Sequence, residues 1–175
     1  QVNTPFVRQH DEYDRETQSY IQKDVSYDNP VFSFWNIIKP DNVEAYNKKP
    51  DTSVPFEEAI LHKGDYWYDF NNREWGTKWD VACPNNNEYS NTYMHSPVPN
   101  GDNLVLVYSF DTAWSPPVPA MIKLSEQYPD LLLTLDWQEE QGFGGQIEFL
   151  RGEINSESDY DSKCDECDEI DCIDY

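Results

Sequence analysis

The stretch SPPVPAMIKLSEQYPDLLLTLDWQEEQGFGGQIEF, residues 115–149, contains the signals of one helix followed by one β-hairpin. Ser115 is a favourable N-cap, Pro116 suits the first helical position, and Pro129 ends the periodic segment. Beyond it, two runs rich in Leu, Ile and Phe are separated by a glycine-rich turn, which is the pattern of two antiparallel strands. The stretch therefore predicts a helix and then a hairpin.

Segments upstream of this stretch predict the other elements of an α+β domain. Strands are expected at 31–38, where VFSFWNII lies between two prolines, at 76–83, and at 103–114, which has apolar residues on both faces. Residues 55–75 are expected to form one or two helical segments. This order predicts a ferredoxin-like sandwich, with an antiparallel or mixed sheet and helices on one face.

The two ends of the chain are more polar than its middle. Residues 1–30 are expected to be an irregular N-terminal arm, and residues 31–152 the ferredoxin-like domain. Residues 153–175 contain ten Asp and Glu residues against one Lys, and are expected to be an acidic tail that cannot fold alone. The Asn- and Pro-rich segment 84–103 is the first place where a partner contact is expected.

A second motif, EWGTKWD at residues 74–80, places two tryptophans on either side of a glycine and a lysine. The chain has 15% aromatic and only 38% apolar residues, so its core is expected to be rich in aromatic side chains. In that interpretation the glycine permits a tight turn and the indoles are buried. The alternative is an exposed aromatic patch with Lys78 at its centre. The structural residues expected in this core and turn are Trp75, Gly76, Trp79 and Trp114.

The segments WYDFNNREWGTKWDV and FDTAWSPPVPAMIKLSEQYPDLLLTLDWQEEQGFGGQIEF resemble the YubB-like proteins of phages and plasmids, which have a ferredoxin-like domain. The resemblance covers roughly residues 31–152 and leaves out the acidic tail and the Asn- and Pro-rich segment. It implies a ferredoxin-like fold and a mobile-element origin, and it implies no catalytic residue.

No catalytic constellation is evident in the sequence. His10, His62 and His95 are scattered, without the H-E-x-x-H or H-x-x-x-H spacing of a zinc protease. The GFGG segment lies in the predicted hairpin and is expected to be a turn, not a phosphate cradle. We therefore expect a protein that is not an enzyme and has no cofactor.

Three cysteines, Cys164, Cys167 and Cys172, give a C-x2-C-x4-C spacing, and Cys83 is the fourth cysteine of the chain. Structural zinc sites usually contain two close-spaced pairs of ligands, whereas this spacing offers one pair and a third cysteine. Zinc completed by Cys83 or His95 and a disulfide within the tail are the alternatives. We expect free thiols and no metal, because a cytoplasmic protein keeps its thiols reduced.

The formal net charge of −22 is the strongest functional signal. An acidic surface repels phosphate backbones, so direct binding of nucleic acid is not expected, and a basic protein is the expected partner. The leading hypothesis is a phage- or plasmid-encoded inhibitor that mimics nucleic acid and blocks the basic channel of a host defence protein, a CRISPR effector or a restriction enzyme. The expected partner-binding residues are Asp159, Asp161, Asp165, Glu166, Asp168, Glu169, Asp171 and Asp174.

Other functions fit the same composition. The arm and the tail are also suited to bind neighbouring subunits in a virion or another assembly, and a small hydrolase is a third class. The acidity is also explained by solubility or salt adaptation alone. No run of 18 apolar residues occurs and the N-terminal residues do not resemble a signal peptide, so a membrane span is not expected and the host cytoplasm is the expected location.

Overall fold

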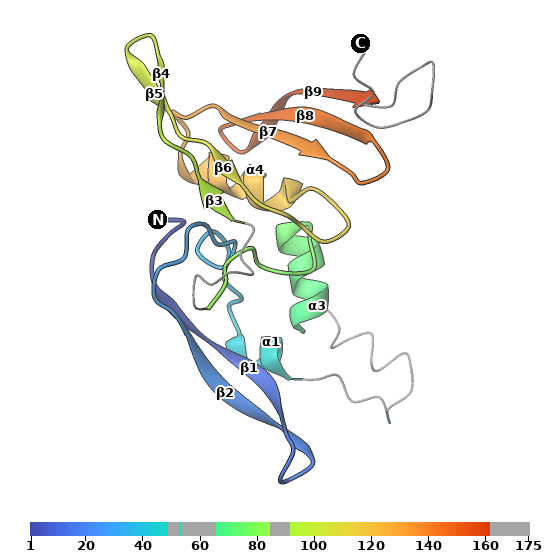
Figure 1. Ribbon diagram of the computed structural model, residues 1–175. Coiled ribbons are helices and arrows are strands. Elements are labelled where there is room, and N and C mark those ends of the chain that lie inside the picture. The colour runs from blue at the N-terminus through green and yellow to red at the C-terminus, as the bar shows by residue number, and fades with distance from the viewer. Residues whose placement is uncertain (49–52, 54–65, 85–91, 162–175) are drawn as a thin grey trace, which may run out of the picture. The chain divides into compact units, whose positions relative to one another are not determined.

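The computed structural model describes residues 1–48, 53, 66–84 and 92–161 (Figure 1). The chain divides into two compact units, Gln1–Pro117 and Val118–Tyr175. Every strand pairing among the described residues is antiparallel, and a few helices accompany the strands, which places the protein in the α+β class. No helix in this part of the chain is long and apolar enough to cross a membrane.

In its described residues, the first unit contains short helices and three pairs of strands. Its elements are β1 (Phe6–Asp14), β2 (Ser19–Tyr27), α1 (Val43–Asn47), α3 (Trp67–Phe70), η1 (Asn71–Trp75), β3 (Tyr93–Met94), β4 (Val98–Asn100), β5 (Asn103–Val105) and β6 (Tyr108–Ser109). Up to residue 161, where its described part ends, the second unit contains one helix and a three-stranded sheet. Its elements are α4 (Val118–Gln127), β7 (Leu133–Gln138), β8 (Phe143–Leu150) and β9 (Glu153–Asp161).

The predicted irregular arm at residues 1–30 is wrong, because β1 and β2 pair there as a regular hairpin (Figure 1). The alternation of its two faces is hidden in the sequence, since two of the inward-facing positions are polar. Phe6, Arg8 and His10 are partly buried, while the residues between them are exposed. Phe6 stacks on Tyr27 of β2 at 4.4 Å between ring centroids. The hairpin thus depends on aromatic and polar contacts that a hydrophobic pattern does not reveal.

The core of the first unit is rich in aromatic residues, as expected, but residues 31–38 do not form the expected strand. Phe32, Phe34 and Trp35 are buried there in a chain of turns. The carboxylate of Asp80 accepts hydrogen bonds from the backbone N–H groups of Phe34 and Trp35, at 2.8 and 3.2 Å. The Asp80 side chain therefore accepts from backbone N–H groups that would pair with a neighbouring strand if this segment were in a sheet.

The strands expected at 76–83 and 103–114 are also wrong in extent. Residues 76–83 form bends, and residues 103–114 contain only β5 and the two-residue β6. We expected the second segment to be buried on both faces, yet Leu104 and Leu106 are 68% and 58% exposed. Apolar residues on both faces of a run therefore did not indicate a central strand here.

The helix and hairpin predicted within residues 115–149 are confirmed as α4, β7 and β8. The helix begins at Val118 instead of Pro116, because the Ser115 hydroxyl donates to the carbonyl of Gly76 instead of capping the helix. The hairpin turns at Gly142, whose φ of 86° is favourable only for glycine. The second unit thus contains the segment in which the helix and turn signals of the sequence are consistent with one another.

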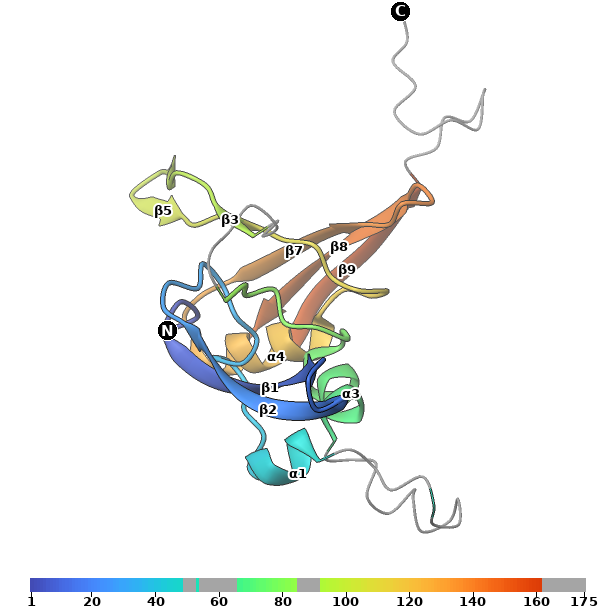
Figure 2. The ribbon, with the colours of Figure 1, turned by 60° about the horizontal axis from the view of Figure 1, so that its bottom comes forward.

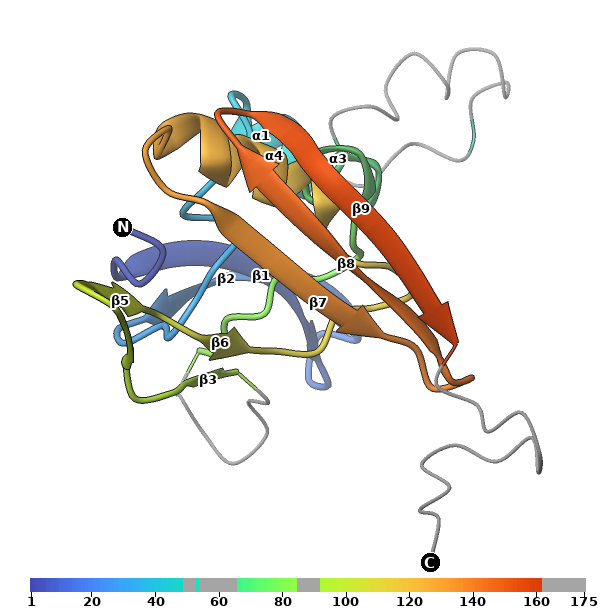
Figure 3. The ribbon, with the colours of Figure 1, turned by 90° about the horizontal axis from the view of Figure 1, so that it is seen from above.

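The predicted start of the acidic tail, residue 153, is too early in the chain, because residues 153–161 form β9 and pair with β8. The backbone N–H of Gly152 donates to the Ser125 hydroxyl at 2.9 Å, which attaches the turn before β9 to α4. Figures 2 and 3 show the three strands side by side, with their far ends extending beyond the helix. The predicted boundaries at 30 and 152 therefore differ from the observed division after Pro117.

Candidate functional site

The motif EWGTKWD turns two of its polar residues, Thr77 and Asp80, inward. The Thr77 side chain is fully buried, and its hydroxyl donates to the Ala113 carbonyl at 3.1 Å and accepts from the Ala113 N–H at 3.0 Å. The Asp80 side chain is only 4% exposed and is anchored on the backbone of residues 34 and 35. These two interior positions direct Lys78 and Trp79 to the surface between them.

Gly76 ends the helical segment η1 with a φ of 80°, in the left-handed region that favours glycine. The expected turn at Gly76 is therefore confirmed, although no strand follows it. Trp75 is fully buried, as expected, and its indole N–H donates to the carbonyl of Ile38 at 3.1 Å. This fixed helix end holds the rest of the motif against the core.

The segment containing Trp114 is attached to the same motif. Besides the two hydrogen bonds between Thr77 and Ala113, Ser115 donates to the Gly76 carbonyl and Thr112 donates to the Ser115 carbonyl at 2.8 Å. Trp114 itself has a φ of 72°. For a bulky residue that conformation costs about 1–2 kcal/mol. The surrounding hydrogen bonds therefore hold Trp114 in a strained position.

The result is an exposed aromatic patch, which we define as Tyr68, Lys78, Trp79 and Trp114. The Lys78 ammonium lies 4.4 Å from the ring centroid of Trp79, 4.7 Å from that of Trp114 and 6.0 Å from that of Tyr68. Trp79 is 56% and Trp114 is 66% exposed, so the prediction that both are buried is wrong. The alternative, a patch centred on Lys78, is what the structure contains.

A buried charged cluster lies beneath the motif. The Arg8 guanidinium is 3.7 Å from the Asp80 carboxylate, donates to the Tyr46 hydroxyl at 2.9 Å and lies 4.7 Å from the Trp35 ring centroid. Tyr46 in turn donates to Asn71 at 3.0 Å. Burial raises the pKa of Tyr46, while Arg8 opposes the shift, so this hydroxyl remains a neutral donor. Sequence analysis missed this cluster because its members are far apart in the chain.

Acidification should destabilise the protein through His10, which contacts the Tyr27 hydroxyl at 2.8 Å. Burial lowers the pKa of His10 below 6.5; Arg8 adds to this effect and Asp11 opposes it. The unfolded chain then takes up the proton first, so stability present above about pH 6.5 is lost as the pH falls below it. The urea midpoint of the wild type should drop more between about pH 7.5 and pH 5.5 than that of His10→Gln. Identical pH dependence of the two proteins would contradict this role.

The predicted acidic binding residues lie only partly within the described chain. Asp159 is exposed on β9, and Asp161 is the last residue of that strand. The other six, Asp165, Glu166, Asp168, Glu169, Asp171 and Asp174, lie outside the described residues. Three exposed acids of β9 have carboxylates that make no hydrogen bond or ion pair with any described residue: Glu153, Glu157 and Asp159. Their charge is therefore open to solvent or to a partner.

The exposed acids of β9 also have a purely structural explanation. In the order β7-β8-β9, β9 is an edge strand of the described sheet. Exposed charges on an edge strand prevent pairing with the sheet of another molecule. The acids of β9 on their own thus fit both protection of an edge and recognition of a basic partner, and only binding experiments with charge variants separate the two.

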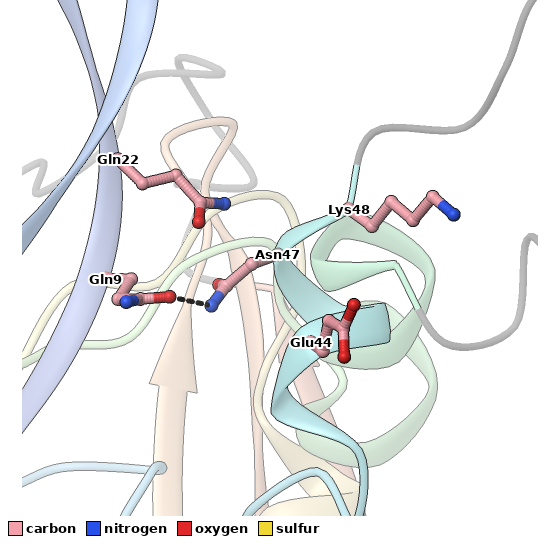
Figure 4. Close-up of a pocket in the computed structure, with 5 residues that line it drawn as sticks. All are labelled: Gln9, Gln22, Glu44, Asn47 and Lys48. Atoms are coloured by element: carbon pink, nitrogen blue, oxygen red, sulfur yellow. Dashed lines mark hydrogen bonds between the residues drawn. The ribbon is translucent and has the colours of Figure 1, made fainter.

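A polar groove of about 340 Å³ lies between the hairpin and α1 (Figure 4). It is lined by Gln9, Gln22, Glu44, Asn47 and Lys48. The Asn47 amide donates to the Gln9 amide oxygen at 3.2 Å, and the Lys48 side chain points away from this pair. The lining residues include no His, Cys or Ser; three of them are amides, and Glu44 and Lys48 add one carboxylate and one ammonium.

The cysteine hypotheses are tested only in part. Cys164, Cys167 and Cys172 lie outside the described residues, and Cys83 forms no disulfide within the described part of the chain. In the described ranges, no group of three or more His, Cys, Asp or Glu side chains is placed to hold a metal ion.

Comparison with curated proteins and with solved structures found no match. Residues 87–173 match the family model described as the ferredoxin-like domain in Api92-like protein. This range begins after the EWGTKWD motif and includes β9 as well as most of the residues beyond it. The resemblance to YubB-like proteins is a separate prediction. The chain therefore carries, over residues 87–173, a ferredoxin-like C-terminal domain of the Api92-like family.

Proposed function

We propose that the protein is a non-enzymatic, acidic inhibitor encoded by a phage or plasmid, which mimics nucleic acid and occupies the basic channel of a host defence protein in the host cytoplasm. The observation that carries the proposal is the concentration of charge in the second unit. Residues 118–175 contain 16 Asp and Glu residues and three Lys and Arg residues. One third of the chain thus carries more than half of the net charge of −22.

The exposed acids of β9 supply part of the required charge density. Glu157 and Asp159 are two residues apart on one strand and therefore point to the same side of the sheet, about 6.6–6.8 Å from each other. One strand of DNA presents a charge about every 3.4 Å along its axis. β9 alone offers about half that density, so the acids after residue 161 are needed to complete the imitation.

The test is displacement of DNA by the whole protein. A fluorescent duplex is bound to a purified restriction endonuclease or CRISPR effector, and its anisotropy is followed as the protein is added. We expect displacement at about 50 mM salt, and at least a tenfold weaker effect at about 200 mM, because ion pairs at the interface are screened. The proposal would be contradicted if none of these proteins released its DNA at low salt. Displacement that does not change with salt concentration would also contradict it.

Two charge-matched variants locate the binding surface. Glu153→Gln, Glu157→Gln and Asp159→Asn together should weaken displacement about tenfold, at up to about 1 kcal/mol for each exposed charge. The control combines Glu16→Gln, Asp24→Asn and Asp102→Asn, which removes three exposed acids of the first unit. Replacing Asp165, Glu166, Asp168 and Glu169 should have a larger effect, mainly through a slower association rate. Equal loss in the β9 variant and its control would mean that displacement depends on the net charge of the protein and not on a binding surface at β9.

A second candidate is a structural or interaction protein of a virion or another assembly. The exposed apolar side chains of β4, β5 and the residue after them favour it, since Val98, Leu104 and Leu106 are all more than half exposed. Contiguous exposed apolar residues are typical of protein interfaces. Co-purification of the protein with particles, in salt that abolishes ionic contacts, would support this candidate over the inhibitor.

A further inference from the structure

The aromatic patch contains a binding arrangement that the acidic surface does not explain. Two indole rings, both more than half exposed, are held with a cation between them. The Lys78 ammonium has no ion-pair partner among the described residues, and its shortest cation–π contacts are with these two rings. Distances of 4.4 and 4.7 Å to the ring centroids are within the range of cation–π attraction.

We propose that Trp79 and Trp114 form a tryptophan clamp that binds an arginine guanidinium of a basic protein partner, and that Lys78 fills this clamp in the free protein. The inference rests on the proposed function in one respect, that the partner is basic. A net charge of −22 selects cationic partners at long range, and the clamp then supplies a short-range contact for one of their side chains.

The chemistry favours a guanidinium over an ammonium as the incoming group. A guanidinium is planar and weakly hydrated, so it stacks on an indole face at a smaller desolvation cost than a lysine ammonium. Lys78 is flexible and strongly hydrated, so it can leave the clamp for water when a guanidinium enters. The ammonium of Lys78 is thus an internal stand-in for the ligand.

The backbone strain at Trp114 is a second, independent observation. Its φ of 72° is unfavourable for a side chain of this size, and the residue gains little from burial because it is 66% exposed. Strained residues persist where the surrounding structure fixes them, and they cluster at binding sites. Here the bond from the Ala113 N–H to the Thr77 hydroxyl and the bond from the Ser115 hydroxyl to the Gly76 carbonyl fix the chain on both sides of Trp114, whose ring centroid lies 4.7 Å from the Lys78 ammonium.

The first experiment compares two peptides of equal charge, nona-arginine and nona-lysine, titrated against the whole protein with tryptophan fluorescence as the signal. Trp79→Ala and Trp114→Ala should each weaken nona-arginine binding about fivefold and change nona-lysine binding less than twofold. Tyr93→Ala, which removes an exposed aromatic outside the patch, should leave both affinities unchanged. Equal loss for the two peptides, or no loss for either, would overturn the clamp.

The second experiment tests the role of Lys78. Lys78→Ala and Lys39→Ala each remove one positive charge from the first unit, and Lys39 is exposed outside the patch. If Lys78 fills the clamp, Lys78→Ala should bind nona-arginine at least threefold more tightly than Lys39→Ala does. Equal affinities of the two variants, or weaker binding by Lys78→Ala, would contradict the proposal that Lys78 fills the clamp in the free protein.

The third experiment uses the strain itself as a readout. Glycine adopts a φ of 72° without cost, so Trp114→Gly should melt about 2–4 °C above Trp114→Ala while both lose nona-arginine affinity equally. A Trp114→Gly protein that melts below Trp114→Ala would show that no strain is held there and would remove this support.

The clamp and the proposed function fail in different ways. If the clamp is wrong, Trp79→Ala and Trp114→Ala will displace DNA from the defence protein as well as the wild type does. If the inhibitor function is wrong, no protein of the panel will release its DNA, while nona-arginine binding still depends on both tryptophans. The first outcome overturns this inference, and the second leaves the clamp supported with a different basic partner.

Discussion

Replacing Asp80 with alanine is expected to lower the free energy of unfolding by about 3–5 kcal/mol, because it leaves the buried Arg8 guanidinium without its counter-charge. The change also removes the acceptor of the Ser33 hydroxyl at 2.7 Å and of two backbone N–H groups in the segment after it. Buried donors without acceptors add to the loss. Urea denaturation followed by circular dichroism measures the effect.

Two further variants make the Asp80 prediction specific. Asp102→Ala removes an exposed carboxylate from the turn between β4 and β5, and should change stability by less than about 0.5 kcal/mol. The double variant Arg8→Met with Asp80→Ala should lose less than the sum of its two single changes, because neither charge is then left alone. Strict additivity would mean that Arg8 and Asp80 do not stabilise each other.

The second unit could be predicted in large part because its sequence signals are local and agree with one another. The helix before Pro129 and the glycine-rich turn of the β7–β8 hairpin each follow from residues close in the chain. β9 could not be predicted as easily. Its segment EINSESDYD is acidic, and it forms a strand because β8 offers backbone partners, which composition does not show.

The first unit shows why the remaining elements were mispredicted. The segment 31–38 has the apolar and aromatic residues of a strand, but Asp80, 46 residues beyond Phe34, takes up its backbone N–H groups. In β1 two of the inward positions are the polar residues Arg8 and His10, so the pattern of a partly buried face was interpreted as an irregular arm. Both errors arise from polar side chains that act at long range in the chain.

The candidate site was predicted only as an alternative. Tryptophan is usually buried, and the rule that an aromatic-rich chain keeps its indoles inside favoured a core position for Trp79 and Trp114. The rule fails here because Thr77 and Asp80 need the interior for their hydrogen bonds. The signal available in the sequence was the pair of polar residues, Thr77 and Asp80, on either side of Lys78 and Trp79. It becomes decisive only when the hydrogen-bond partners of those residues are known.

Within the motif EWGTKWD, replacement by alanine should destabilise the protein far more at Trp75 than at Trp79. Trp75→Ala is expected to cost about 3–5 kcal/mol, because its fully buried indole packs against Phe34 and Phe70 at centroid distances of 6.0 and 6.1 Å. It also leaves the carbonyl of Ile38 without its indole donor. Trp79→Ala should cost less than about 1 kcal/mol, since more than half of that side chain is already in water. Urea midpoints and slopes of the two variants provide the comparison.

The paired design separates burial from aromatic content, because both variants remove the same side chain within five residues of one motif. Trp75→Phe serves as the intermediate case: it keeps most of the buried ring and loses the hydrogen bond, so it should fall between the wild type and Trp75→Ala. Cation–π contacts add only about 0.5–1 kcal/mol at exposed sites, so the loss of the Lys78 contact cannot raise Trp79→Ala to the level of Trp75→Ala. Equal losses for Trp75→Ala and Trp79→Ala would indicate that both indoles lie in the core. The proposed clamp needs an exposed Trp79, so this result would also contradict the clamp.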